Sequence, residues 1–184
     1  WMTYLPEELN QIYEMLHYVK PKGRVLVGGL GLGILTRLLM FHPGVTKVVT
    51  IEKEQNVIDL VLPINRSVET QFLRSNTYTA DIAAALKTCP PYDYYLLDTW
   101  AGTNETTWWE TVLPLRRIIR QRYGSKPIIH CWAEDIMLGQ VRHALVIDDS
   151  EKKMLQLHNS TPGNKKLTLS DCRVWFYKNF PTNM

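Results

Sequence analysis

The sequence has few cysteines, and no two of them lie close together. Cys89, Cys131 and Cys172 are the three among 184 residues, and they form no Cys-x-x-Cys pair. A disulfide framework needs pairs of cysteines, and a structural zinc site needs closely spaced ones, so neither is indicated as the organising feature of the fold. We expect thiols in a reducing compartment and place the protein in the cytoplasm.

Long apolar runs, internal repeats and a large charge excess are also lacking. No stretch of about 18 apolar residues occurs, which argues against a membrane-spanning helix, and no secretory signal pattern is found. The net charge of +3 is too small to indicate nucleic-acid binding by itself. Arg116, Arg117, Arg120 and Arg122 invite a phosphate or RNA hypothesis. They also fall near a predicted helix C-terminus, where the helix dipole favours cations, so nucleic acid is not expected as a partner.

The composition is that of a folded globular chain, with 45% hydrophobic and 21% charged residues. A chain of this length can bury a substantial core without disulfides or metals. We expect one domain over 1–184, in which an N-terminal helix over 1–20 precedes an α/β core over 21–147. A loop and a closing strand would follow over 148–184.

A glycine-rich turn between a strand and a helix is the most informative feature. Val25–Val27 is β-branched and apolar, as in a buried strand, and the helical pattern of Ile34–Phe41 follows it. Between them Gly29, Gly31 and Gly33 make a turn without side chains, which a ligand can approach closely. The start of the helix would face whatever lies over this turn.

Acidic residues follow the next predicted strands in turn. Glu52 follows the apolar run 45–51, Asp81 follows 77–80, and Asp98 follows 94–97. The carboxyl ends of parallel strands meet at one edge of an open sheet, where nucleotides are bound and where a carboxylate can accept both hydroxyls of a ribose. The pattern predicts a site for a nucleoside-containing small molecule.

The remaining elements are predicted from periodicity and from turn residues. Leu5–Val19 reads as an amphipathic helix, and Glu54–Leu62 as a helix that stops near Pro63. Asn104 is placed to cap a helix in which Pro114 makes a kink or starts a second helix. A fifth strand over 126–132, a helix over 134–146 and a closing strand over 172–177 complete the series.

This order of glycines and acids resembles the class I S-adenosylmethionine (SAM)-dependent methyltransferases over roughly residues 20 to 135. The motifs Val-Leu-Val-Gly-Gly-Leu-Gly-Leu-Gly, His-Pro-Gly-Val-Thr-Lys-Val-Val and Ile-Glu-Lys-Glu are most similar to the spermidine-synthase-like branch. The chain departs from that branch where the polyamine enzymes carry Asp-Ser-Ser-Asp, since the segment from Asp98 reads Asp-Thr-Trp-Ala-Gly-Thr. It also lacks a counterpart of their amino-terminal β domain.

The resemblance implies a Rossmann-like α/β fold, with a mainly parallel twisted sheet, helices on both faces and an antiparallel edge strand. It also implies roles for the predicted site. The glycine turn would pass the methionine part of the cofactor, Glu52 would take the ribose and Asp81 the adenine amino group. Asp98 would face the sulfonium and the acceptor as the catalytic group, with Trp100 beside it in the acceptor site. The predicted cofactor contacts are Gly29, Leu30, Gly31, Gly33, Glu52, Lys53, Asp81, Ile82 and Asp98.

Each of these residues also has a purely structural interpretation. The glycines could serve packing, Glu52 could be a solvated strand end and Asp81 could cap the following helix. Asp98 could act as a cap as well, and Trp100 could pack under the next helix. No metal site is predicted, because His130 and Cys131 are neighbours on a strand and point to opposite faces.

The function implied by the resemblance is methyl transfer from SAM to a small-molecule acceptor that the sequence does not identify. Two alternatives stay open. One is aminopropyl transfer to an amine, for which decarboxylated SAM would be the donor. The other is a non-catalytic module that retains the nucleoside site and works through the interface of a homo-oligomer.

Overall fold

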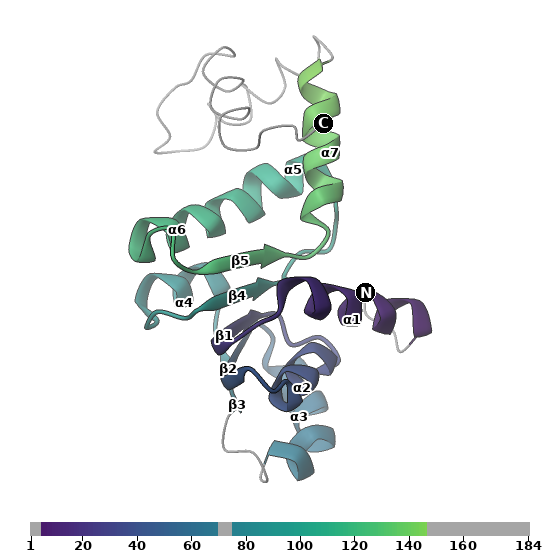
Figure 1. The fold of residues 1–184 in the computed structure, drawn as a ribbon, viewed down its shortest axis with the longest axis vertical. Coiled ribbons are helices and arrows are strands. Elements are labelled where there is room, and N and C mark those ends of the chain that lie inside the picture. Colours follow the sequence, from purple (N-terminus) through teal and green to yellow (C-terminus); the bar gives the residue numbers. More distant parts are fainter. Residues whose placement is uncertain (1–4, 70–74, 147–184) are drawn as a thin grey trace. The chain divides into compact units, whose positions relative to one another are not determined.

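The computed structural model of the chain describes residues 5–69 and 75–146 (Figure 1). The chain divides into two compact units. The first consists of Trp1–Ala101 with Val112–Trp132, and the second of Gly102–Thr111 with Ala133–Met184. The sheet and all of the predicted site residues lie in the first unit. The prediction of a single domain over 1–184 includes residues outside the described ranges and stays a prediction.

The first unit is built on a five-stranded parallel sheet with the order β3-β2-β1-β4-β5. Figure 1 shows the strands one above another, with β3 lowest and β5 uppermost. Their bounds are β1 (Gly23–Gly28), β2 (Val45–Glu52), β3 (Ser75–Thr79), β4 (Tyr94–Leu97) and β5 (Ile128–Cys131). The predicted antiparallel strand over 172–177 lies outside the described residues.

Helices cover both faces of this sheet. They are α1 (Pro6–Val19), α2 (Ile34–Phe41), α3 (Gln55–Glu69), α4 (Ile82–Thr88) and α6 (Leu113–Tyr123). The Rossmann-like α/β architecture expected from the sequence is therefore confirmed. In the described residues no helix is long and apolar enough to cross a membrane.

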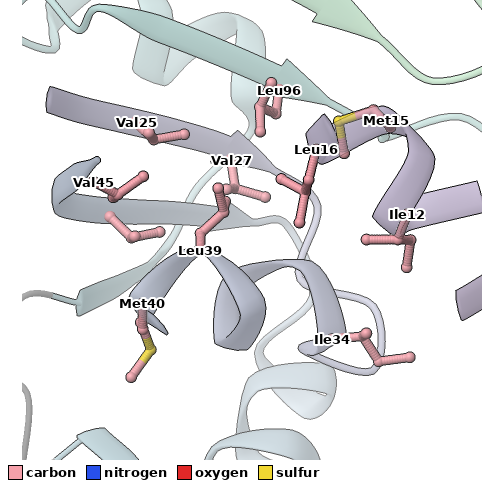
Figure 2. Close-up of a cluster of buried hydrophobic side chains, with 11 residues drawn as sticks. Ile12, Met15, Leu16, Val25, Val27, Ile34, Leu39, Met40, Val45 and Leu96 are labelled. Atoms are coloured by element: carbon pink, nitrogen blue, oxygen red, sulfur yellow. The ribbon is translucent and has the colours of Figure 1, made fainter. Parts of the chain in front are cut away.

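One face of the sheet is buried under α1 and α2, and Figure 2 shows this cluster of apolar side chains. The strands contribute Val25, Val27, Val45, Val48 and Leu96, and the helices contribute Ile12, Met15, Leu16, Ile34, Leu39 and Met40. In the same layer the hydroxyls of Thr36 on α2 and Thr50 on β2 are 2.9 Å apart and fully buried, so each satisfies the other.

The opposite face carries α4 and α6. Tyr95 of β4 is fully buried and stacks on Tyr123 of α6 with ring centroids 6.0 Å apart. A β-carbon placed on Gly28 would lie 2.9 Å from the Leu97 side chain and 3.3 Å from that of Ile82 at the start of α4. Close packing of α4 on β1 therefore needs a glycine at this position.

The helix predicted to stop near Pro63 continues through it, which corrects that prediction. Pro63 lies inside α3, which ends at Glu69. Proline removes one backbone hydrogen bond, to the carbonyl of Asp59 four residues earlier. Both residues are exposed, so water can satisfy that carbonyl, while Ile58 and Val61 keep the buried side of the helix packed against Leu30.

The second unit contains the short helix α5 (Glu105–Thr107) and α7 (Glu134–Val146). The Asn104 side chain caps α5 by accepting from the Thr107 N–H at 2.8 Å, as predicted. A π-helical segment, Trp108–Val112, then joins α5 to α6. Pro114 occupies the first turn of α6, where proline is tolerated, so it starts a second helix.

Candidate functional site at the carboxyl edge of the sheet

Four strands of the first unit end at the same level of the sheet. Gly28 pairs with Ile51 on one side and with Leu97 on the other, and Glu52 pairs with Thr79. The chain passes from β1 to β2 on one side and returns from β3 to β4 on the other, so the strand order reverses at β1. In open α/β sheets the crevice at such a switch point is where ligands bind.

The glycine turn follows β1 at this switch point. Gly29, Gly31 and Gly33 have φ values of +89°, +52° and +76°, in the region that only glycine adopts readily. Gly29 is also held by packing, because a β-carbon there would lie 2.1 Å from the backbone oxygen of Asp98. The close packing of the turn against the end of β4 therefore explains the glycine at this position without a ligand.

Glu52 connects the end of β2 to the glycine turn. One oxygen of its carboxylate accepts a hydrogen bond from the Leu30 N–H at 2.8 Å, and the other accepts from the Glu54 N–H at 3.0 Å. Two backbone donors therefore orient the carboxylate over the turn. Each oxygen keeps the capacity to accept a hydrogen bond from a further donor.

The other residues predicted to contact the cofactor differ in where their side chains lie. The Leu30 side chain is buried against Ile58 and Val61 of α3, and Ile82, the first residue of α4, is buried as well. Lys53 is exposed, and its side chain is free of the core. Asp81 caps α4 by accepting from the Ala84 N–H at 2.9 Å, which is the structural role that the sequence also allowed.

Asp98 lies at the end of β4, directly beside the start of the glycine turn. Its own N–H donates to the Gly28 carbonyl at 2.9 Å, so the backbone is fixed. Burial raises the pKa of its carboxyl from 3.8 to about 6. Two smaller effects oppose each other: the positive charge of the chain's amino group lowers this pKa, and the negative charge of Glu8 on α1 raises it. Such a carboxyl is a stronger base than an ordinary aspartate and can exchange a proton near neutral pH.

Trp100 and Glu8 complete the description of this edge. The indole Nε1 of Trp100 is buried and has no hydrogen-bond partner within residues 5–69 and 75–146. Glu8 was not among the site residues predicted from the sequence. Helical spacing does place Glu8 on the same face of α1 as Ile12, four residues later. Only the tertiary structure shows that this face of the helix packs near β4.

The arginines of α6 have structural partners. Arg116 donates to the Ile129 carbonyl at 3.1 Å, Arg120 to the Pro127 carbonyl at 2.8 Å, and Arg122 to the Cys89 carbonyl at 3.4 Å. These bonds to backbone oxygens give the guanidinium groups a role that needs no phosphate. Among the described residues, no group of three or more His, Cys, Asp or Glu side chains is placed to hold a metal ion.

No family model and no curated protein matches the sequence. Solved structures do match the fold. The precorrin-8w decarboxylase of Methanobacterium thermoautotrophicum aligns with a TM-score of 0.55 at 17% identity, over 82% of this chain and 73% of that protein. A conserved hypothetical protein of Streptococcus pyogenes aligns with a TM-score of 0.52 at 18% identity, over 64% of this chain and 72% of that one.

A methyltransferase is among these structures. Coclaurine N-methyltransferase, solved with N-methylheliamine and S-adenosylhomocysteine (SAH), aligns with a TM-score of 0.53 at 16% identity. The alignment covers 70% of this chain, which spans 37% of the length of that enzyme. The closer likeness to the spermidine-synthase-like branch stays a prediction. With its strand order and with these neighbours, the chain has the Rossmann-like fold of the class I SAM-dependent methyltransferases.

Proposed function

We propose that the chain binds SAM at the carboxyl edge of the sheet and transfers its methyl group to a small acceptor. The observation that carries the proposal is the Glu52 carboxylate, which two backbone N–H groups hold over a turn of three glycines with positive φ. This turn lies at the switch point of a sheet whose order matches the class I methyltransferases.

The residues present fit the cofactor. Glu52 would accept the ribose hydroxyls, the glycine turn would leave room for the methionine part, and Asp81 would take the adenine amino group with the oxygen that does not cap α4. When bound, SAM supplies a methyl group on a positively charged sulfur, so an acceptor lone pair can displace the sulfur, which keeps the electron pair of the broken carbon–sulfur bond. The chain has to orient the acceptor in line with that bond and exclude water.

Asp98 and Trp100 would form the acceptor side of the site. The raised pKa of the Asp98 carboxyl suits a group that takes a proton from the acceptor, and the backbone of Asp98 lies directly against the glycine turn. The buried Trp100 N–H would gain from the acceptor the hydrogen bond that it does not make within the described residues.

The first test is the binding of SAM by calorimetry, with decarboxylated SAM and NAD as competing candidates. Wild-type protein should bind SAM or SAH and not NAD. Glu52→Ala should weaken SAM binding roughly tenfold or more, because hydrogen bonds to a charged group contribute about 1.5–3 kcal/mol. Glu54→Ala is the matched control, since it removes an exposed carboxylate two residues away and keeps the N–H that Glu52 uses.

The reaction is tested by its products. SAH with a methylated acceptor supports the proposal, and methylthioadenosine with an aminopropylated amine would support the polyamine alternative. Tight SAM binding without either product, over a broad panel of acceptors, would indicate the non-catalytic module. An unchanged SAM affinity of Glu52→Ala, with the fold intact by thermal melting, would contradict the site itself.

A further inference from the structure

Positive charge gathers at the amino edge of the sheet in the first unit, where the strands begin and the helices end. Figure 1 shows α6 ending on the side of the sheet from which β5 starts. The bases at these helix ends and strand starts are Lys20, Lys22, Arg24, Lys47, Lys87 and Lys126. Arg24 and Lys47 are half-buried and occupy paired positions on β1 and β2, and the other four are exposed.

A series of ring contacts joins the start of β1 to the ends of α4 and α6. The Arg24 guanidinium lies over the Tyr92 ring, 4.9 Å from its centroid. Tyr92 packs edge-on against Tyr95, which stacks on Tyr123 at the end of α6. The Tyr123 hydroxyl donates to the carbonyl of Cys89, the residue after α4. The bases on these elements therefore belong to one continuous surface.

Acidic groups do little to offset this charge. Asp93 is the one acid at these helix ends and strand starts among the side chains that the structure describes, and its carboxylate already accepts from the Arg24 N–H at 2.8 Å. Helix dipoles favour the bases that follow α1 and end α4. They do not explain the bases at strand starts, so the excess charge of the amino edge is complementary to a polyanion.

The net charge of the chain conceals this surface. Acids at the opposite edge, such as Glu52, Asp81 and Asp98, offset the bases in the total of +3. A polyanion responds to the local potential of the face that it approaches rather than to the average over the molecule. The expectation that nucleic acid is not a partner rested on the net charge, and the fold removes that reason for the amino edge.

An exposed aromatic ring lies beside the lysines. Tyr18 is in the last turn of α1, two residues before Lys20, and is 84% exposed. An unpaired nucleic-acid base can stack on such a ring, and single strands are bound through stacking together with contacts between bases of the protein and phosphates. The nucleobases of a duplex stack on one another instead. The combination of lysines and an exposed ring therefore favours a single strand.

We infer that the amino edge binds single-stranded nucleic acid, with the lysines on its phosphates and Tyr18 stacked on a base. Neighbouring strands of a sheet are about 4.8 Å apart, so the edge from β2 to β5 spans about 14 Å. That length corresponds to about four nucleotides at the spacing of about 3.4 Å found in one strand of a duplex. The inference does not depend on the proposed function, because SAM would bind at the opposite edge.

The test measures the binding of a fluorescein-labelled oligothymidylate of about 15 nucleotides, within the site sizes of known single-strand-binding folds. Full-length protein is titrated and fluorescence anisotropy is recorded between about 50 and 200 mM salt. We expect a Kd of about 1–100 µM at low salt, which rises as salt is added because counterions are released from the phosphates. No binding, or a Kd that does not depend on salt, would overturn the inference.

The exposed lysines are tested one at a time. Lys22→Gln, Lys87→Gln and Lys126→Gln should each weaken binding, and each should reduce the slope of log affinity against log salt by about 0.7, the value for one phosphate contact on a single strand. Arg37→Gln is the matched control, since it removes the same charge from an exposed position in the middle of α2. It should change neither quantity. Equal effects of the four variants would show that binding follows net charge and would overturn the site.

Stacking is tested on two exposed tyrosines of α1. Tyr18→Leu should raise the Kd roughly tenfold, because alanine substitutions assign a contribution of this size to a stacked base. Tyr13→Leu is the control, since this ring is 55% exposed but lies farther from the end of the helix. It should leave the Kd unchanged. Equal effects of the two variants would contradict the role of Tyr18.

Two competing partners are compared with the single strand. A thymidylate–adenylate duplex of the same length should bind more weakly, and vesicles of equal parts phosphatidylcholine and phosphatidylserine should not bind. Tighter binding of either one would overturn the inference. Saturating SAM should not displace the oligonucleotide. Failure of the protein to bind SAM would contradict the proposed function and would leave this inference standing.

Discussion

The two edges of the sheet in the first unit differ in how their polar groups are hydrogen-bonded. At the amino edge the groups satisfy one another. The Asp93 carboxylate accepts from the Arg24 N–H at 2.8 Å, and the buried Tyr95 hydroxyl accepts from the Tyr92 N–H at 3.1 Å. The Tyr123 hydroxyl donates to the Cys89 carbonyl. Folding alone therefore gives Asp93, Tyr95 and Tyr123 their hydrogen-bond partners.

The carboxyl edge is left incomplete by folding. Three glycines there have positive φ, and Asp98 is buried enough to raise its pKa to about 6. No hydrogen bond to its carboxylate is found within the described residues. The Trp100 N–H is buried without a partner in the same part of the chain. A buried carboxyl and an unsatisfied N–H cost stability, so their occurrence beside the glycine turn indicates where a ligand is expected to bind.

The largest expected effect comes from Asp98→Asn. If Asp98 takes the proton of the acceptor, turnover should fall by about 10²–10⁴-fold, while the affinity for SAM stays within a few-fold. SAH formation and calorimetry measure the two quantities. Equal loss of turnover in a variant of the amino edge would remove the distinction between the edges.

The same variant should be more stable than the wild type at pH 8. The folded-state pKa of Asp98 is raised, so ionising it costs more in the folded protein than in the unfolded chain. Its relative contribution is fully favourable below pH 3.8 and is lost as the pH rises through about 6. Asp98→Asn should therefore gain about 3 kcal/mol at pH 8, and this gain should vanish below about pH 4. Denaturant unfolding at both pH values checks the sign.

Gly29→Ala should destabilise the first unit by about 3 kcal/mol, because the new β-carbon would overlap the Asp98 carbonyl and φ is positive. Gly124→Ala is its control at the amino edge. Gly124 also has positive φ, +69°, but nothing lies within 4 Å of its added β-carbon. It should lose less, roughly 1–2 kcal/mol, from backbone strain alone. Equal losses would mean that the packing of the glycine turn on β4 is not tight.

Tyr95→Phe should have the smallest effect, and it tests the amino edge. Removing the hydroxyl leaves the Tyr92 N–H without its buried acceptor, so we expect a loss of about 1–2 kcal/mol in unfolding free energy. SAM affinity should not change. Tyr18→Phe, at an exposed position, should alter neither quantity. A loss of SAM affinity in Tyr95→Phe with stability retained would indicate that SAM binds at the amino edge, and would contradict the proposed site at the carboxyl edge.

Local patterns were sufficient for most elements. The apolar periodicities predicted α2, β4 and α7 with their observed bounds, and Asn104 was correctly assigned as a cap. Pro63 was wrongly taken as a helix stop, because the preference of proline is local whereas α3 is anchored by Ile58 and Val61.

The amino-acid sequence determined the order of strands and helices, the three-glycine turn and the acids that follow successive strands, because these depend on neighbours along the chain. The tertiary structure decided which of those groups find hydrogen-bond partners within the folded protein. In the folded protein Asp81 caps α4, and the Glu52 carboxylate accepts hydrogen bonds from two backbone N–H groups. Asp98 is buried, and the charge of Glu8 acts on its carboxyl group. Such partners are far apart in sequence and meet only when parallel strands align at one edge. The hydrogen bonding and the pKa values of the acidic groups at this edge therefore depend on the fold.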